Sequence, residues 1–92
     1  MKELIILGAG GHARSLIDII LSTNEWKIAG IVGKKNELNK LIMGFEVKWT
    51  DDKLITLRKD FKYAVLAIGK LGVNQKRIHK IKELKSIGYE IP

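Results

Sequence analysis

The first twenty-one residues place an apolar run, a glycine-rich turn and an amphipathic segment in direct succession. Leu4 to Leu7 is an unbroken apolar run, which is typical of a parallel strand covered on both faces. Gly8, Gly10 and Ala13 follow with the spacing G-x-G-x-x-G/A. From Ala13 to Leu21 apolar residues recur every three or four positions, as in a helix with one buried face. This order predicts an α/β fold built on parallel strands.

The glycine turn is the first candidate binding site, because each small residue in it has a separate physical role. Gly8 permits the tight turn out of the strand, Gly10 lets the backbone approach a pyrophosphate closely, and Ala13 keeps the helix near the sheet. Backbone N–H groups and the positive end of the helix dipole would then stabilise an anion. The alternative is a plain strand-to-helix turn that binds nothing.

Gly11, His12 and Arg14 complete this candidate loop. The ring of His12 could donate a hydrogen bond to a phosphate or a sugar hydroxyl, or it could only cap the loop. Arg14 could pair with a phosphate through two hydrogen bonds, or it could be solvated, as arginines in a first helical turn often are. Both alternatives stay open from the residues alone.

The rest of the chain alternates strands and helices. The pattern predicts strands at 27–32, 45–49 and 63–68, helices at 51–59 and 73–86, and a last short strand at 89–91. We therefore expect a small Rossmann-like three-layer α/β domain with a four- to five-stranded, mainly parallel sheet, in the order 3-2-1-4 with any fifth strand beyond strand 4. Parallel strands end at one edge, so Gly33, Lys34, Gly69 and Lys70 should border the same crevice as the glycine turn.

Composition excludes several classes of protein and site. The chain has 92 residues, a formal net charge of +7 and no cysteine, so it has neither a disulfide framework nor a thiolate metal site. The lysines are spread along the chain without interleaved aromatic residues, and we expect no nucleic-acid partner. No segment approaches the roughly 20 apolar residues of a membrane span, and no signal peptide opens the chain. We expect a soluble, cytoplasmic protein.

No catalytic constellation can be assembled from these residues. The chain has no cysteine nucleophile, no G-x-S-x-G sequence and no His, Asp or Glu cluster with metal-ligand spacing, so we assign no catalytic residue and no metal ligand. Asp51 and Asp52 resemble a general acid/base pair, but capping of the helix at 51–59 explains them better. His79 has no neighbouring carboxylate in the sequence and receives no role.

Several short sequences together resemble the N-terminal domain of the sugar O-/N-acyltransferases, which include the sialic acid O-acetyltransferases and the PglD-like N-acetyltransferases of UDP-amino-sugars. The similarity runs through essentially the whole chain, and its most specific pieces are Gly10-Gly11-His12-Ala13, Gly44-Phe45-Glu46-Val47, Ala67-Ile68-Gly69 and Arg77. The resemblance implies that residues 1–92 form a single Rossmann-like domain that holds a nucleotide sugar for glycan biosynthesis. It also implies that His12 contacts the ligand.

The same resemblance bears on catalysis. In the family, a left-handed β-helix follows this domain and supplies the catalytic histidine and the acetyl-CoA site at a trimer interface. The sequence stops at Pro92, about where that second domain would begin. We therefore expect this chain to bind a nucleotide sugar without acetylating it alone and to hold no cofactor of its own. A homo-oligomer and a separate catalytic chain both remain open as partners.

The end of the second strand departs from the family pattern. The family often places acidic residues there, and NAD-binding folds place an Asp or Glu there to hold the ribose hydroxyls, but this chain has Gly33, Lys34 and Lys35. The two lysines could instead attract the 2′-phosphate of NADP. The alternative function is therefore a non-catalytic module that binds NADP or another phosphorylated ligand.

Overall fold

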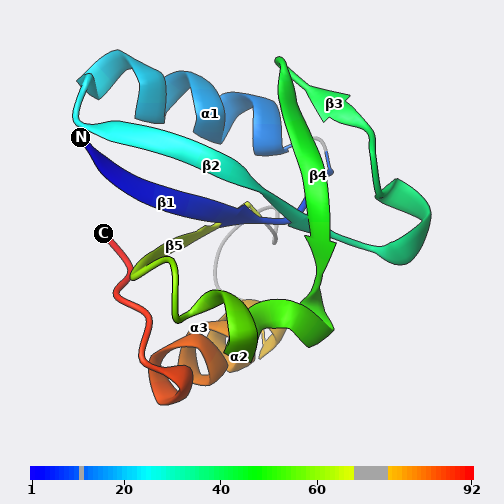
Figure 1. The fold of residues 1–92 in the computed structure, drawn as a ribbon, viewed down its shortest axis with the longest axis vertical. Helices are drawn as coiled ribbons and strands as arrows, with labels where there is room; N and C mark the ends of the chain where they lie inside the picture. The colour runs from blue at the N-terminus through cyan, green and yellow to red at the C-terminus, as the bar shows by residue number, and fades with distance from the viewer. Residues whose placement is uncertain (11, 68–74) are drawn as a thin grey trace.

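A five-stranded sheet forms the centre of the computed structural model, which describes residues 1–10, 12–67 and 75–92 (Figure 1). The strand order is β3-β4-β2-β1-β5, and the β1–β2, β1–β5 and β2–β4 pairs are all parallel. Only β3 runs antiparallel to its neighbour within this sheet. The strands are β1 (Lys2–Leu7), β2 (Trp26–Gly33), β3 (Leu41–Ile42), β4 (Phe45–Thr50) and β5 (Tyr63–Leu66).

Helices cover both faces of the sheet and complete three layers (Figure 1). Helix α1 (His12–Thr23) lies on one face, and α2 (Leu54–Leu57) and α3 (Gln75–Ile87) lie on the other. Two short 3-10 turns, η1 (Lys35–Glu37) and η2 (Asp51–Lys53), follow β2 and β4. None of the helices in the described ranges has the length and apolar character that a membrane crossing requires.

Strand β1 supplies side chains to both layers of the core. Leu4 and Ile6 lie in the cluster with Ile17 of α1, whereas Ile5 and Leu7 lie in the cluster that contains residues of α2 and α3. All four β1 side chains are at most 2% exposed. Burial of each such side chain contributes about 1.5–3 kcal/mol relative to exposure. The unbroken apolar run in the sequence therefore reflects a strand with no solvated face.

The predicted fold class and strand order are confirmed. The predicted strands 1 to 4 correspond to β1, β2, β4 and β5, and their order in the sheet is the expected 3-2-1-4. The fifth strand, however, is β3, which lies beyond β4 at the opposite edge from the expected position. At the expected position, next to β5, the chain makes only an isolated bridge between Tyr63 and Glu90.

The β3–β4 hairpin explains this difference. Met43 and Gly44 have φ values of +52° and +88°, and positive φ at both central residues is the conformation that two-residue hairpin loops favour. Glycine adopts this conformation without strain, which explains Gly44 at the turn. Strand β3 is only two residues long, Leu41–Ile42, so its sequence contains too little alternation to predict a strand.

The helix expected at 51–59 is shorter than predicted. It consists of η2, a 3-10 turn, and α2, which ends at Leu57. The N-cap residues of η2 and α2 are Thr50 and Lys53, and neither makes a side-chain capping hydrogen bond. The capping interpretation of Asp51 and Asp52 is therefore wrong. Their carboxylates have other partners, Lys80 and Thr50 respectively.

Beyond α3, the chain returns to the core. The N–H of Gly88, which has φ +112°, donates to the carbonyl oxygen of Leu84 at 3.1 Å, as in a C-terminal glycine cap. The hydroxyl of Tyr89, a residue 3% exposed, donates to the carbonyl oxygen of Leu54 at 2.6 Å. This bond connects the C-terminal segment to α2, so it helps to hold α2 against the sheet.

Replacement of Leu84 by Ala should lower the free energy of unfolding by about 2–5 kcal/mol, because the leucine is fully buried between α3 and the sheet. Ile55→Ala is the control, since Ile55 is 72% exposed, and its effect should stay within about 0.5 kcal/mol. Urea denaturation of both variants measures the difference. Equal losses would contradict the assignment of Leu84 to the core.

Stability at high pH should depend on Tyr89. Burial raises the pKa of its hydroxyl above the usual 10.0, so the folded state favours the protonated form. The resulting stability is present below about pH 10 and is lost as pH rises through the folded pKa. Tyr89→Phe should be less stable than wild type at neutral pH by about 0.5–1.5 kcal/mol, because the Leu54 carbonyl loses one donor and keeps the N–H of Arg58.

Urea denaturation between about pH 8 and about pH 11 tests this prediction. The difference between wild type and Tyr89→Phe should narrow as pH rises, because only the wild type loses the tyrosine contribution. Lysines that deprotonate in this range are common to both proteins and cancel in the comparison. A constant difference across the range would refute the prediction.

Candidate functional site

A cavity of about 920 Å³ lies at the carboxyl edge of the parallel strands. Its walls come from the ends of β1, β2, β4 and β5, the start of α1, the turn η1 and one side chain of α3. This is the volume of a typical small-molecule site, and this edge is where open α/β sheets bind ligands. The described lining is Leu7, Gly8, Ala9, Gly10, His12, Val32, Gly33, Lys34, Lys35, Glu37, Leu38, Thr50, Asp51, Asp52, Ala67 and Lys80.

The glycine turn forms one wall of this cavity. Gly8 has φ +110°, a conformation that favours glycine, and its N–H donates to the carbonyl oxygen of Val32 at 2.8 Å. The N–H of Ala13 donates to the carbonyl oxygen of Gly10 at 3.0 Å. These two donors are already used within the fold, so an anion here would need the other amides of the turn.

The predicted site residues fall into three groups. Five of them line the cavity: Gly8, Gly10, His12, Gly33 and Lys34. Two of the predicted residues do not line it, since Ala13 is buried in the core against the sheet and Arg14 is exposed on α1. The remaining three, Gly11, Gly69 and Lys70, lie outside the described residues.

A second wall begins where β2 ends. A Cβ on Gly33 would lie 2.9 Å from a methyl carbon of Val47 and 3.0 Å from Oε1 of Glu37, so this position has no room for a side chain. Glu37 accepts a hydrogen bond from the backbone N–H of Lys34 at 2.7 Å. Lys34 and Lys35 are exposed, and Glu37 is half-buried.

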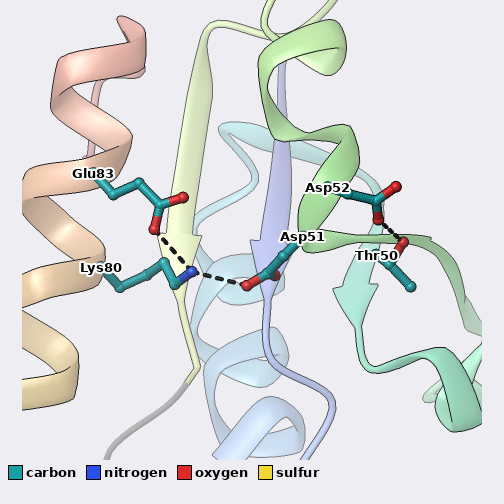
Figure 2. Close-up of polar contacts among 5 residues, drawn as sticks. All are labelled: Thr50, Asp51, Asp52, Lys80 and Glu83. Carbon is teal, nitrogen blue, oxygen red and sulfur yellow. Dashed lines mark hydrogen bonds and ion pairs between the residues drawn. The ribbon is translucent and has the colours of Figure 1, made fainter.

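The third wall holds a group of charged residues that Figure 2 shows. Lys80 of α3 lies between two carboxylates, with its ammonium 2.8 Å from Asp51 and 3.0 Å from Glu83. The hydroxyl of Thr50 donates to Asp52 on the same wall. Thr50, Asp51, Asp52 and Lys80 line the cavity.

Protonation of Lys80 and Asp52 follows from these contacts. Partial burial lowers the pKa of the Lys80 ammonium, but hydrogen bonds and charge attraction from Asp51 and Glu83 outweigh it and leave the pKa above the usual lysine value. The hydrogen bond from Thr50 lowers the pKa of the Asp52 carboxyl. Both groups are therefore charged at neutral pH, and the cavity presents carboxylates as well as ammonium groups to a ligand.

Sequence reasoning did not identify Glu37, Asp51, Asp52 or Lys80 as cavity residues. Asp51 and Asp52 could have been found, because they directly follow a parallel strand and must lie at the edge where the others end. Lys80 could not have been found in this way, because its place depends on how α3 packs against the sheet. Within the described residues no three His, Asp or Glu side chains gather as a metal site.

Comparison with protein families decides what kind of domain this is. The model of the PglD N-terminal domain matches residues 3–84, which is most of the chain. The chain belongs to the PglD N-terminal domain family. Comparison with curated proteins finds no match.

Solved structures agree with this membership. Two mutant forms of a GDP-perosamine N-acetyltransferase from Caulobacter crescentus, each in complex with CoA and GDP-perosamine, superpose on this PglD N-terminal domain with TM-scores of 0.81 at 26% identity. The match covers 97% of this chain and only 40% of each transferase, so the chain spans less than half of their length. A UDP-D-quinovosamine 4-dehydrogenase from Vibrio fischeri shares the fold, with a TM-score of 0.76 at 19% identity, and the match covers 98% of this chain and 75% of that one.

The ion pairs of Lys80 should stabilise the fold modestly. Lys80→Gln should lower the free energy of unfolding by about 0.5–1 kcal/mol, because the side chain is only 19% exposed and its removal leaves Asp51 and Glu83 without their shared cation. Lys62→Gln is the matched control, since the Lys62–Glu90 pair is 56% exposed on both sides. The Lys80 effect should shrink in about 1 M salt. Equal effects for both variants would count against this role for Lys80.

Proposed function

We propose that this domain binds a nucleotide sugar of the UDP-amino-sugar type, as the substrate-binding part of a cytoplasmic sugar acetyltransferase in glycan biosynthesis. The observation that supports this most directly is the cavity between the glycine turn and the ends of the parallel strands. Membership of the PglD N-terminal domain family supports the class of ligand, and the two transferase structures contain GDP-perosamine.

The diphosphate would lie at the glycine turn. This turn leads into α1, whose first N–H groups have no partner within the helix and whose dipole is positive at that end. A Cβ on Gly10 would have no atom within 4 Å, which leaves the backbone here open to close approach by a phosphate. Gly11 would belong to the same cradle.

His12 and the lysines after β2 would complete the contacts. His12 is the first residue of α1 and lines the cavity, and its ring would donate a hydrogen bond to a phosphate or a sugar hydroxyl. Lys34 also lines the cavity and would attract the anionic ligand. Arg14 would contribute only through its charge, because it is not part of the lining. Gly69 and Lys70, which follow β5 in the sequence, would also contact the ligand.

Acetyl transfer itself would use residues outside this sequence. The chain matches 40% of each transferase structure, and the family resemblance assigns the catalytic histidine and acetyl-CoA to the other domain. We therefore propose that residues 1–92 form one domain that contributes ligand binding and no catalytic residue.

A second candidate is a module that binds NADP. Lys34 and Lys35 both line the cavity where β2 ends, which is where a 2′-phosphate is held in NADP-binding folds. Calorimetry with a UDP-amino-sugar, a GDP-amino-sugar, a CMP-sugar and NADP distinguishes the two candidates. Binding of nucleotide sugars without NADP supports the first, and binding of NADP alone overturns it.

Gly10→Val tests the phosphate cradle. The added side chain meets nothing within 4 Å of its Cβ and needs no positive φ, so the variant should fold. Its methyl groups would stand in the cavity wall where the diphosphate should lie, so affinity for the nucleotide sugar should fall by about 100-fold or more in calorimetry.

Ser15→Val is the control for this variant, because Ser15 is exposed on the same helix and does not line the cavity. It should bind like wild type, and both variants should unfold within a few degrees of wild type. Unchanged affinity in a folded Gly10→Val protein would remove the glycine turn from the site.

A further inference from the structure

An acidic side chain lies beside the carboxyl end of β2, although no residue at the end of the strand is acidic. In dinucleotide-binding sheets an Asp or Glu near this position accepts hydrogen bonds from the ribose. Here the strand ends at Gly33, followed by Lys34. Oε1 of Glu37 would lie 3.0 Å from a Cβ on Gly33, so the Glu37 carboxylate occupies the space beside the strand end.

The carboxylate of Glu37 is held in place. The turn η1 folds back on the end of β2, and the backbone N–H of Lys34 donates to Oε1 of Glu37 at 2.7 Å. This is the one hydrogen bond that the described residues give the Glu37 side chain. The residue is half-buried and lines the cavity. A carboxylate oriented in advance in this way loses little entropy when it accepts a further hydrogen bond.

The type of group that Glu37 can bind follows from its charge. An ionised carboxylate only accepts hydrogen bonds, and it repels phosphate. The diphosphate is therefore expected at the backbone amides of the glycine turn and not at the Glu37 carboxylate. The groups of a nucleotide sugar that can donate toward Glu37 are the ribose hydroxyls and the N–H groups of the base.

We propose that Glu37 is the residue that determines recognition of the nucleoside, by accepting hydrogen bonds from the ribose hydroxyls or from the N–H edge of the base. This inference rests on the proposed function, because it assumes a nucleotide in the cavity. It also gives the ligand a direction, with the phosphates at Gly8 and Gly10 and the nucleoside over the end of β2.

Glu37→Gln tests this role while it preserves the shape of the side chain. The amide oxygen can still accept from the Lys34 N–H, but one acceptor and the negative charge are lost. Affinity for UDP and GDP in calorimetry should fall about tenfold or more, as for a hydrogen bond to a charged group. Glu46→Gln is the control, since Glu46 is also half-buried and does not line the cavity.

The 2′,3′-dideoxy forms of both nucleotides separate the two sources of hydrogen bonds. If Glu37 contacts the ribose, the Gln variant and wild type should bind the dideoxy forms equally. If it contacts the base, the difference between them should persist and should change from UDP to GDP. Both outcomes support the proposal.

Two outcomes overturn it. A folded Glu37→Gln protein that binds UDP and GDP within about twofold of wild type would remove Glu37 from recognition while leaving the proposed function intact. Wild type that binds neither nucleotide would overturn the proposed function and this inference together.

Glu37→Asp is a second variant that tests the position of the carboxylate, because it keeps the charge but withdraws the carboxylate by one methylene. It should bind more weakly than wild type and unfold at a similar temperature.

Discussion

Parallel pairing of β1 with β2 and β5 is the constraint on which the rest of the structure depends. Leu7 is in register with Val32 of β2 and with Leu66 of β5, so the three strands end at the same level. The turn after β1 and the turns after β2 and β4 consequently open onto one edge. Helices cover both faces of β1, and the cavity of about 920 Å³ lies at this edge.

The sequence predicts those parts of the fold that depend on local patterns. The apolar run at Leu4 to Leu7, the glycine turn and the helix after it are each marked by their own residues, and the strand order follows from right-handed crossovers. The two-residue strand β3 and the short length of α2 are not predicted, because hairpin pairing and side-chain partners decide them. Within the site, Gly8, Gly10, His12, Gly33 and Lys34 were expected at the edge from topology alone. Lys80 reaches it only through the packing of α3, whereas Glu37 reaches it through the short turn η1 and its hydrogen bond with Lys34.

The net positive charge of the chain does not predict the mixed charge of the cavity lining. The chain carries +7, yet carboxylates of Glu37, Asp51 and Asp52 line the cavity beside Lys34, Lys35 and Lys80. The Lys80 ammonium is shared by Asp51 and Glu83, so little of its charge is available to attract an anion. A phosphate would therefore be bound mainly by backbone amides and the helix dipole, and the side chains would distinguish one ligand from another. On the proposed function, this division of roles would let a basic domain recognise one ligand without binding every polyanion.

The fold alone does not decide which nucleotide is bound, because the same fold occurs in a dehydrogenase at a TM-score of 0.76. The end of β2 bears on the kind of ligand that this chain can bind. Val47 and Glu37 fill the space where a side chain on Gly33 would begin, so a carboxylate cannot be placed there without moving one of them. An acidic group that recognises a nucleoside must then come from elsewhere in the fold. Because η1 brings Glu37 to this point and Lys34 holds it there, the glycine at the strand end and the glutamate after it act as one structural unit.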